Sequence, residues 1–394
     1  MSMAAIRMSF SWVDRDPRRP LRPMSDDRRT AFAEGEAILY RLFDVGYEIH
    51  LDAVADLLAP ITTERAGPGR GEAQAIQIAN PPVTARLGSE HIEVGGVRHQ
   101  ADVSARIFDF GVVSLRISIP CPGPTWPSFV ALGCRLESIA GMPAFFGVQL
   151  EKLLGRIGAA IERPGVASVT EDYTVFRLPR VLGDDGSELS LATLRDDELV
   201  QLLLGERRTL SPATRQELLP HRFSYGLDDL VIPTWTSALI VEPVSEDTDI
   251  QYVLEFANAQ LLELRVYDAL LDAELPRMYD RITRSRSRPT LLWRRFGPLL
   301  QDLQMLVADS TEIVERAENS LKVTDDVYLS RVYASAIDIF RGRAWRRSID
   351  RKLTIIRETY EMLNAESLAL RGETMELVIV LLITVELVLG IVRR

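Results

Sequence analysis

Apolar and polar residues alternate with two different periods along the chain. Between residues 74 and 119, short runs such as HIEV and VVSLRISI alternate with a period of two, and Gly95-Gly96 lies between two such runs. This period with a glycine dipeptide indicates antiparallel strands joined by a tight hairpin. Strand patterns return in SVTEDYTVFRLPRV and LDDLVIPTWTSALIVEP. These later strands can join the sheet that the first ones form.

Helical spacing separates the strand segments. It ends at Pro60 in LDAVADLLAP, runs over residues 126–163 with a break at Gly141-Met142-Pro143, and returns in a polar stretch over residues 190–218. Strands, helices and strands again predict an α+β domain over residues 36–245. Residues 1–35 are arginine-rich and lack the apolar stretch of a secretory signal, so we expect a disordered leader there.

After residue 247 the strand patterns vanish, and helical spacing predicts a bundle or stalk over residues 247–370. Its last helix carries a heptad seam of about three repeats, formed by Ile349, Leu353, Ile356, Tyr360 and Leu363. Two interpretations stay open for this seam. It can form a coiled coil between chains, or it can belong to one helix of a bundle within the chain.

The final segment, residues 373–394, is almost entirely apolar. Thirteen of the sixteen residues from Leu377 to Val392 are Leu, Ile or Val. On an insertion scale their sum outweighs the cost of the central Glu386. The segment therefore predicts a C-terminal transmembrane helix, a tail anchor that contacts the lipid bilayer and leaves the N-terminal domain in the cytoplasm.

One stripe of this segment carries its acidic and small residues. Its members recur at helical spacing and are Glu376, Ile383, Glu386 and Gly390. An ionisable side chain within an apolar helix usually faces protein. We expect the stripe to mediate self-association into a homo-oligomer through a Glu386 hydrogen bond. The alternative is a tolerated, protonated side chain.

Composition changes this picture little. The net charge is −10, with 46% hydrophobic and 26% charged residues, which is typical of a folded protein and argues against one that coats nucleic acid. Only three of the 46 basic residues are lysine, which suggests a high-GC, bacterial genome and weakens arginine clusters as signals. Candidate partner-binding residues are Arg284, Arg286, Arg288, Arg346 and Arg347. They bind RNA or a ribosome in one interpretation and form a solvated face in the other.

Candidate chemistry is sparse. Four histidines and two cysteines predict no metal site, and we expect no cofactor and no catalytic residue. Asp228-Asp229 is a carboxylate pair, but neighbours on a strand point to opposite faces, and Asp favours turns. The alternative is a membrane-attached hydrolase or nucleotide-dependent enzyme that uses these carboxylates of the α+β domain.

Three stretches resemble the required-for-meiotic-nuclear-division family: ARIFDFGVVSLRI, the pair LDDLVIPTWTSALIVEP and LEFANAQLLELRVYDALL, and the ending MELVIVLLITVELVLG. The resemblance covers the chain from about residue 75 to its end. It implies an α+β domain, a helical stalk, a C-terminal membrane anchor and homo-oligomers. It also implies a link to translation, and it implies no enzymatic reaction.

Together these predictions describe a non-enzymatic, tail-anchored scaffold that self-associates and presents its α+β domain to a protein partner. The predicted location is the bacterial inner membrane. The alternative location is the mitochondrial inner membrane.

Overall fold

A computed structural model of the 394-residue chain describes residues 35–59, 63–65, 80–121, 125–136, 141–183, 185–206, 208, 210–243, 249–287, 301, 304–305, 308 and 326–392. The predicted leader, apart from residue 35, and most of the helical pattern over residues 290–321 lie outside the described residues.

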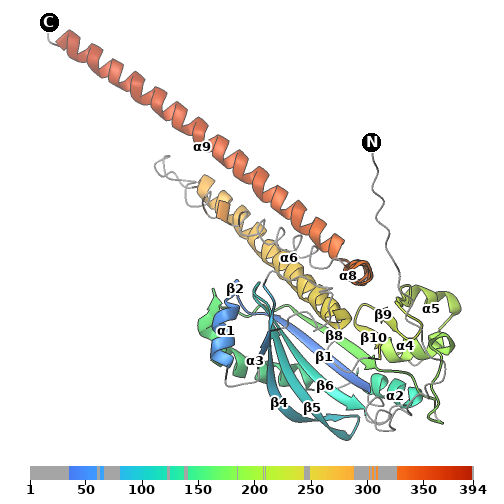
Figure 1. Cartoon of the computed structure of the whole chain (residues 1–394). Helices are drawn as coiled ribbons and strands as arrows, with labels where there is room; N and C mark the ends of the chain where they lie inside the picture. Colours follow the sequence, from blue (N-terminus) through green and yellow to red (C-terminus); the bar gives the residue numbers. More distant parts are fainter. Residues whose placement is uncertain are drawn as a thin grey trace, which may run out of the picture.

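One sheet organises the N-terminal part of the chain (Figure 1). Its eight strands lie in the order β3-β4-β5-β6-β1-β8-β10-β9. Their bounds are β1 (Gly35–Asp44), β3 (Thr63–Arg65), β4 (Val83–Val94), β5 (Val97–Ile107), β6 (Val112–Cys121), β8 (Thr170–Leu178), β9 (Leu230–Pro233) and β10 (Ser237–Val241). Neighbouring strands are antiparallel except β8 and β10, which are parallel. The short strands β2 (Glu48–Ile49) and β7 (Ile161–Glu162) form a separate pair.

The predicted hairpin and the predicted return of late strands to the first sheet are confirmed. Gly95 and Gly96 both have positive φ in the turn between β4 and β5, a backbone conformation that two-residue hairpin turns require. The late strand pair β9 and β10 joins the sheet through β8. The sequence patterns thus found strands on both sides of the middle strand β1.

β1 lies in the middle of the sheet and was missed by the sequence patterns. It pairs with β6 on one side and β8 on the other. Alternate side chains enter two separate cores, with Ala37 and Phe43 in one and Ile38 and Leu42 in the other. Because both faces of β1 are covered, its apolar residues do not alternate with polar ones, and the period of two is lost.

Short helices cover one face of the sheet (Figure 1). They are α1 (Leu51–Leu58), α2 (Trp126–Leu136), α3 (Met142–Ile157) and α4 (Asp196–Leu204), and α5 (Pro212–Leu218) packs on α4. The helix break predicted at Gly141-Met142-Pro143 separates α2 from α3. Gly141 has a positive φ, and Pro143 lies in the first turn of α3.

The first half of α6 (Asp249–Ser287) and helix α8 (Val327–Ile339) cover the opposite face. Polar side chains of α6 are buried there together with apolar ones. Glu255 forms an ion pair with Arg106 of β5, and both side chains are at most 4% exposed. Gln251 donates a hydrogen bond to the Tyr40 hydroxyl of β1. These bonds fix the position of α6 on the sheet, because unpaired buried polar groups are costly.

α9 (Gly342–Val392) is 51 residues long and packs on α6 through its first half only. The two helices run in the same direction, since Trp345 contacts Arg265 and Lys352 binds Asp268 further along both helices. The predicted seam residues Ile349, Leu353, Ile356 and Leu363 are buried in this contact, and Tyr360 is partly buried. Within the single chain, the seam therefore packs on α6.

The predicted transmembrane helix over residues 373–394 is wrong. Among the residues that the structure describes, no helix combines the length and apolarity needed to cross a membrane. Glu376 and Glu386 bound a charge-free run of nine residues, Leu377–Val385. At 1.5 Å per residue this run is about 14 Å long, under half of a hydrocarbon core of about 30 Å. The predictions of a tail anchor, of contact with the lipid bilayer and of an inner-membrane location all depended on this span. They are therefore wrong as well.

Candidate functional site

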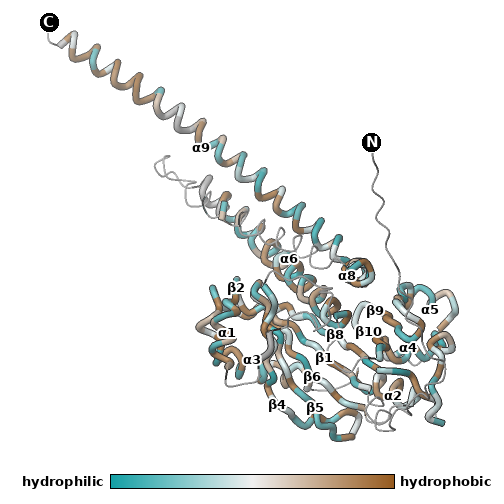
Figure 2. Tube along the Cα trace, in the orientation of Figure 1, coloured by the Kyte–Doolittle hydropathy of each residue, from teal (hydrophilic) through white to brown (hydrophobic). Residues whose placement is uncertain are grey.

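The second half of α9 projects beyond every other described element (Figure 1). We call Met375–Ile391 the distal segment. All its large apolar side chains are between 44% and 67% exposed. Figure 2 shows that hydrophobic residues predominate along this part of the helix. Contiguous exposed apolar surface of this kind marks a site of association.

The predicted stripe lies on the distal segment. Glu376, Ile383, Glu386 and Gly390 are all exposed in the single chain. The Thr384 hydroxyl donates a hydrogen bond of 2.7 Å to the Val380 carbonyl and so is satisfied within the helix. Glu386 is therefore the polar group at the centre of this surface that can bond to another molecule.

The predicted arginines fall at two distant places. Arg346 and Arg347 lie near the start of α9, where Arg347 is exposed and donates a hydrogen bond to the Arg343 carbonyl. Arg284 and Arg286 lie at the other end of the α6–α9 pair, but their side chains are outside the described part (Figure 1). Arg288 lies outside it altogether. The fold thus does not join the two groups into one basic surface.

Asp228 and Asp229 lie in the turn before β9. The Asp229 carboxylate accepts hydrogen bonds from the backbone N–H groups of Tyr225 and Gly226 and from the Ser224 hydroxyl. These bonds order the turn, as Asp commonly does. Within the described ranges, no group of three or more His, Cys, Asp or Glu side chains could hold a metal ion.

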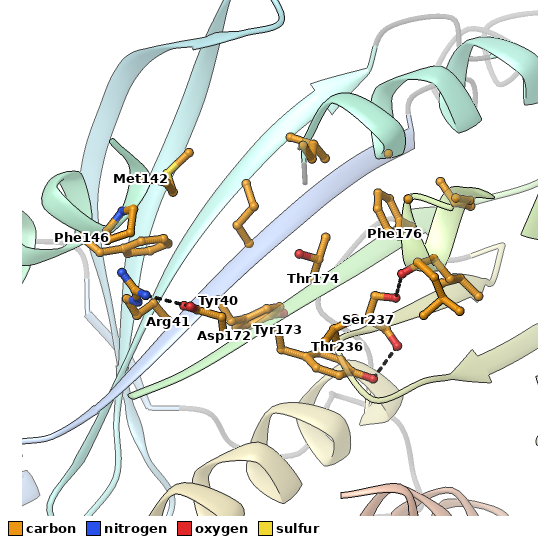
Figure 3. A pocket seen from close by; sticks show the side chains of 18 residues that line it. Tyr40, Arg41, Met142, Phe146, Asp172, Tyr173, Thr174, Phe176, Thr236 and Ser237 are labelled. Atoms are coloured by element: carbon orange, nitrogen blue, oxygen red, sulfur yellow. Dashed lines mark hydrogen bonds and ion pairs between the residues drawn. The ribbon is translucent and has the colours of Figure 1, made fainter. Parts of the chain in front are cut away.

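A pocket of about 310 Å³ lies on the face of β1 and β8 that α2, α3 and α4 cover (Figure 3). Leu39 and Arg41 of β1 and Thr174 and Phe176 of β8 form its floor. The ends of α2, α3 and α4 form its walls, with Leu136, Met142, Phe146 and Leu202–Gly205. Arg41 makes an ion pair of 2.7 Å with Asp172 at one end of the pocket.

The sequence patterns did not find this pocket. Arg41 is the one charged residue within the run AILYRLF, and a charge inside an apolar strand is a signal for a buried polar site. That signal could have been read. The approach of α2, α3 and α4 to Arg41 could not, because these helices lie about 90 to 160 residues away along the chain.

The fold and the distal segment define an α+β protein that extends one long C-terminal helix with an apolar end. Residues 34–248 match the family described as "Uncharacterized protein MJ0711, N-terminal domain". The match covers more than half of the chain, and the chain belongs to this family. A similar curated protein is "Uncharacterized protein MJ0711" of the archaeon Methanocaldococcus jannaschii. It is 24% identical over 248 residues, which cover 62% of this chain and 73% of that protein. No solved structure matches.

These matches correct the family predicted from sequence motifs. The resemblance to the required-for-meiotic-nuclear-division family is contradicted, and so is the bacterial member of it, because the similar protein is archaeal. Most of the motifs that carried the resemblance are strands and helices of the apolar cores, and the last one is the exposed distal segment. Unrelated proteins share apolar patterns of these types. The link to translation, and with it most of the support for an RNA or ribosome partner, came from this resemblance and falls with it.

Proposed function

We propose that the protein is a non-enzymatic scaffold that self-associates through the distal segment of α9 and presents its α+β domain to a protein partner. One observation carries the proposal: the apolar side chains of residues 375–391 are exposed around the helix in the single chain. Ordinary monomers expose single apolar residues rather than a continuous apolar surface.

The occupant of this surface is a second and further copies of the same segment. Leu, Ile and Val side chains interdigitate well between helices, and a helix apolar on all sides is covered only when several neighbours surround it. The distal segment lies clear of the sheet and of the described part of α6, so its side chains are open to other copies (Figure 1). Association of parallel copies places every α+β domain at the same end of the assembly.

Glu386 gives this association its register. In a bundle of parallel copies, the carboxyl groups of Glu386 meet near Gly390, which leaves room because it has no side chain. A hydrogen bond between carboxyl groups in an apolar seam specifies alignment at a cost in stability, as single polar residues do in coiled coils. The proposal assigns no reaction, and the carboxylate of Asp229 already serves the turn that holds it.

Sedimentation velocity of the full chain tests the proposal. We expect an oligomer at micromolar concentration, and we expect Leu381→Lys to shift it to the monomer. Leu368→Lys is the matched control, because Leu368 and Leu381 lie on the same helix and are 58% and 59% exposed. A monomeric wild-type chain, or equal effects of both variants, would contradict self-association through the distal segment.

Glu386 variants test the register. Glu386→Gln keeps a hydrogen-bonding group and should keep the size of the oligomer, whereas Glu386→Leu should give a mixture of sizes. Identical single sizes for both variants would show that the carboxyl group does not select the assembly. The partner of the α+β domain is then sought by photo-crosslinking from that domain, since three lysines give amine-reactive reagents too few sites.

A further inference from the structure

The pocket beside Arg41 combines apolar walls with one cationic group. Its volume of about 310 Å³ falls at the lower end of the range for small-molecule sites. Leu136, Met142, Phe146 and Phe176 supply apolar surface, and the hydroxyl-bearing residues Thr174 and Thr236 line it as well (Figure 3). A site of this composition fits a molecule with an apolar body and one polar end.

The side chain of Arg41 is held in place, but not all of its N–H groups form hydrogen bonds within the described part of the chain. Its side chain is 14% exposed, and its guanidinium lies 6.0 Å from the centre of the Phe146 ring. Its Nε–H is buried and has no hydrogen-bond partner in the described part of the chain. A buried donor without a partner is costly, so the hydrogen-bonding capacity of this guanidinium is not used up within the described part of the chain.

The partner of Arg41 within the chain can be displaced. Asp172 binds the Nη2 atom of Arg41, and its side chain is 61% exposed. An exposed carboxylate gains little from an ion pair, because water solvates it nearly as well. A carboxylate that enters the pocket could make two parallel hydrogen bonds with the guanidinium and so compete with Asp172.

The walls select the charge of the ligand. The last turn of α4, Leu202–Gly205, lines the pocket. The C-terminal end of a helix carries partial negative charge, which disfavours a doubly charged anion such as a phosphate monoester. One arginine beside such a helix end suits a group with a single negative charge.

We propose that this pocket binds a small organic monocarboxylate with an apolar body, anchored by Arg41. The walls are rigid enough to form the site before the ligand arrives. Trp126 of α2 donates a hydrogen bond of 2.8 Å to Glu198 of α4, and the Ser237 hydroxyl donates one of 2.6 Å to the Leu203 carbonyl. The site lies far from the distal segment, so the proposal does not depend on self-association (Figure 1).

Calorimetric titration of the full chain with 3-phenylpropionate and with its neutral amide tests the site. We expect the acid to bind at least about tenfold more tightly than the amide, since charge-assisted hydrogen bonds are worth this much. Arg41→Gln should abolish the preference for the acid. No binding of the acid at 10 mM, or equal binding of acid and amide, would overturn the proposal.

Asp172→Asn is the decisive second variant, because we expect it to increase the affinity for the acid. Removal of the competing carboxylate should tighten binding of the acid several-fold and leave the amide unchanged. The substitution is at an exposed side chain, so the fold should tolerate it. Asp196→Asn is the matched control, since it breaks the Arg222–Asp196 ion pair of 2.5 Å outside the pocket. Weaker or unchanged binding of the acid in Asp172→Asn would show that the Arg41–Asp172 pair is purely structural.

Discussion

The first half of α6 buries polar side chains together with its apolar ones, whereas the distal segment of α9 leaves apolar side chains exposed. Glu255 and Gln251 of α6 are polar and almost completely buried. The distal segment is nearly all Leu, Ile and Val, and its apolar side chains are about half exposed. Both helices follow the α+β domain in the chain, and only one of them packs on it.

The difference shows what brings a helix onto a sheet. The sheet supplies polar partners for α6. Arg106 of the sheet pairs with Glu255, and Tyr40 of the sheet accepts a hydrogen bond from Gln251. The distal segment has no partner within the described chain and lies beyond the reach of the sheet (Figure 1). The buried half of α6 thus combines apolar side chains with polar groups that the sheet matches, whereas the distal segment has apolar side chains alone.

The largest effect should come from the buried glutamate of α6. We expect Glu255→Ala to lower the free energy of unfolding by about 3–5 kcal/mol, because it leaves the buried charge of Arg106 without its partner. Glu386→Ala, in the distal segment, should stay within about 0.5 kcal/mol. Urea unfolding followed by tryptophan fluorescence compares the two. Similar losses of unfolding free energy in Glu255→Ala and Glu386→Ala would contradict the difference in burial between α6 and the distal segment.

A matched pair of leucines gives the next largest difference. Leu262 of α6 is fully buried, whereas Leu381 is 59% exposed. Leu262→Ala should cost about 2–5 kcal/mol through lost burial and the cavity that it leaves. Leu381→Ala should leave the unfolding midpoint of the α+β domain unchanged and reduce only the size of the assembly. A loss of domain stability in Leu381→Ala would mean that the distal segment packs on the domain.

A buried carboxyl group of the domain should make its stability depend on pH. Burial raises the pKa of Asp44 to about 6, although a hydrogen bond with the backbone of Gly46 opposes this. The folded chain therefore holds this proton more tightly than the unfolded chain, whose Asp pKa is about 3.9. This contribution, up to about 3 kcal/mol, is present at low pH and is lost as pH rises to about 6.

Asp44→Asn tests this pH dependence. The difference in unfolding free energy between Asp44→Asn and the wild type should change between about pH 4 and about pH 7 and stay constant above that. Denaturant titrations at intervals of half a pH unit measure it. A constant difference over the whole range would contradict the raised pKa.

The smallest expected effect concerns the ion pairs that hold the first half of α9 on α6. Lys352 of α9 binds Asp268 at 2.7 Å and Asp272 at 2.6 Å, both on α6. Burial alone would lower the pKa of Lys352, but hydrogen bonds with the two carboxylates raise it above its ordinary value. Lys352→Met should cost about 1–2 kcal/mol. Arg357→Met, an exposed change one turn along, is the control for thermal unfolding. Equal losses of stability in Lys352→Met and Arg357→Met would show that the ion pairs of Lys352 do not stabilise the contact between α9 and α6.

Local patterns were enough for the parts of the fold where apolar and polar residues alternate or a turn residue marks a break. The hairpin at Gly95-Gly96, the strands β5 and β6 and the break between α2 and α3 all follow from residues close in sequence. β1 escaped detection, because it carries apolar side chains on both of its faces and therefore shows no alternation. The pocket escaped as well, since Arg41 meets Asp172 and the walls of α2 and α4 only after the sheet has formed.

The C-terminal helix shows the limit of composition. Its apolar sum predicted a membrane span, but the charge-free run between Glu376 and Glu386 is too short for one. The seam of Ile349, Leu353 and Ile356 left open whether it packs within or between chains, and the described chain places it on α6. A heptad pattern states that a helix has a partner and does not state which helix that is.

The sequence by itself determined the α+β class, the periods of strand and helix, and the presence of a long apolar helix at the end of the chain. These depend on backbone geometry and on contacts between near neighbours. Only the tertiary structure decided that α6 is buried through Glu255, that Arg41 lines a pocket, and that the distal segment projects without cover. Each of these depends on which distant parts of the chain come into contact, and local sequence patterns do not predict such long-range contacts.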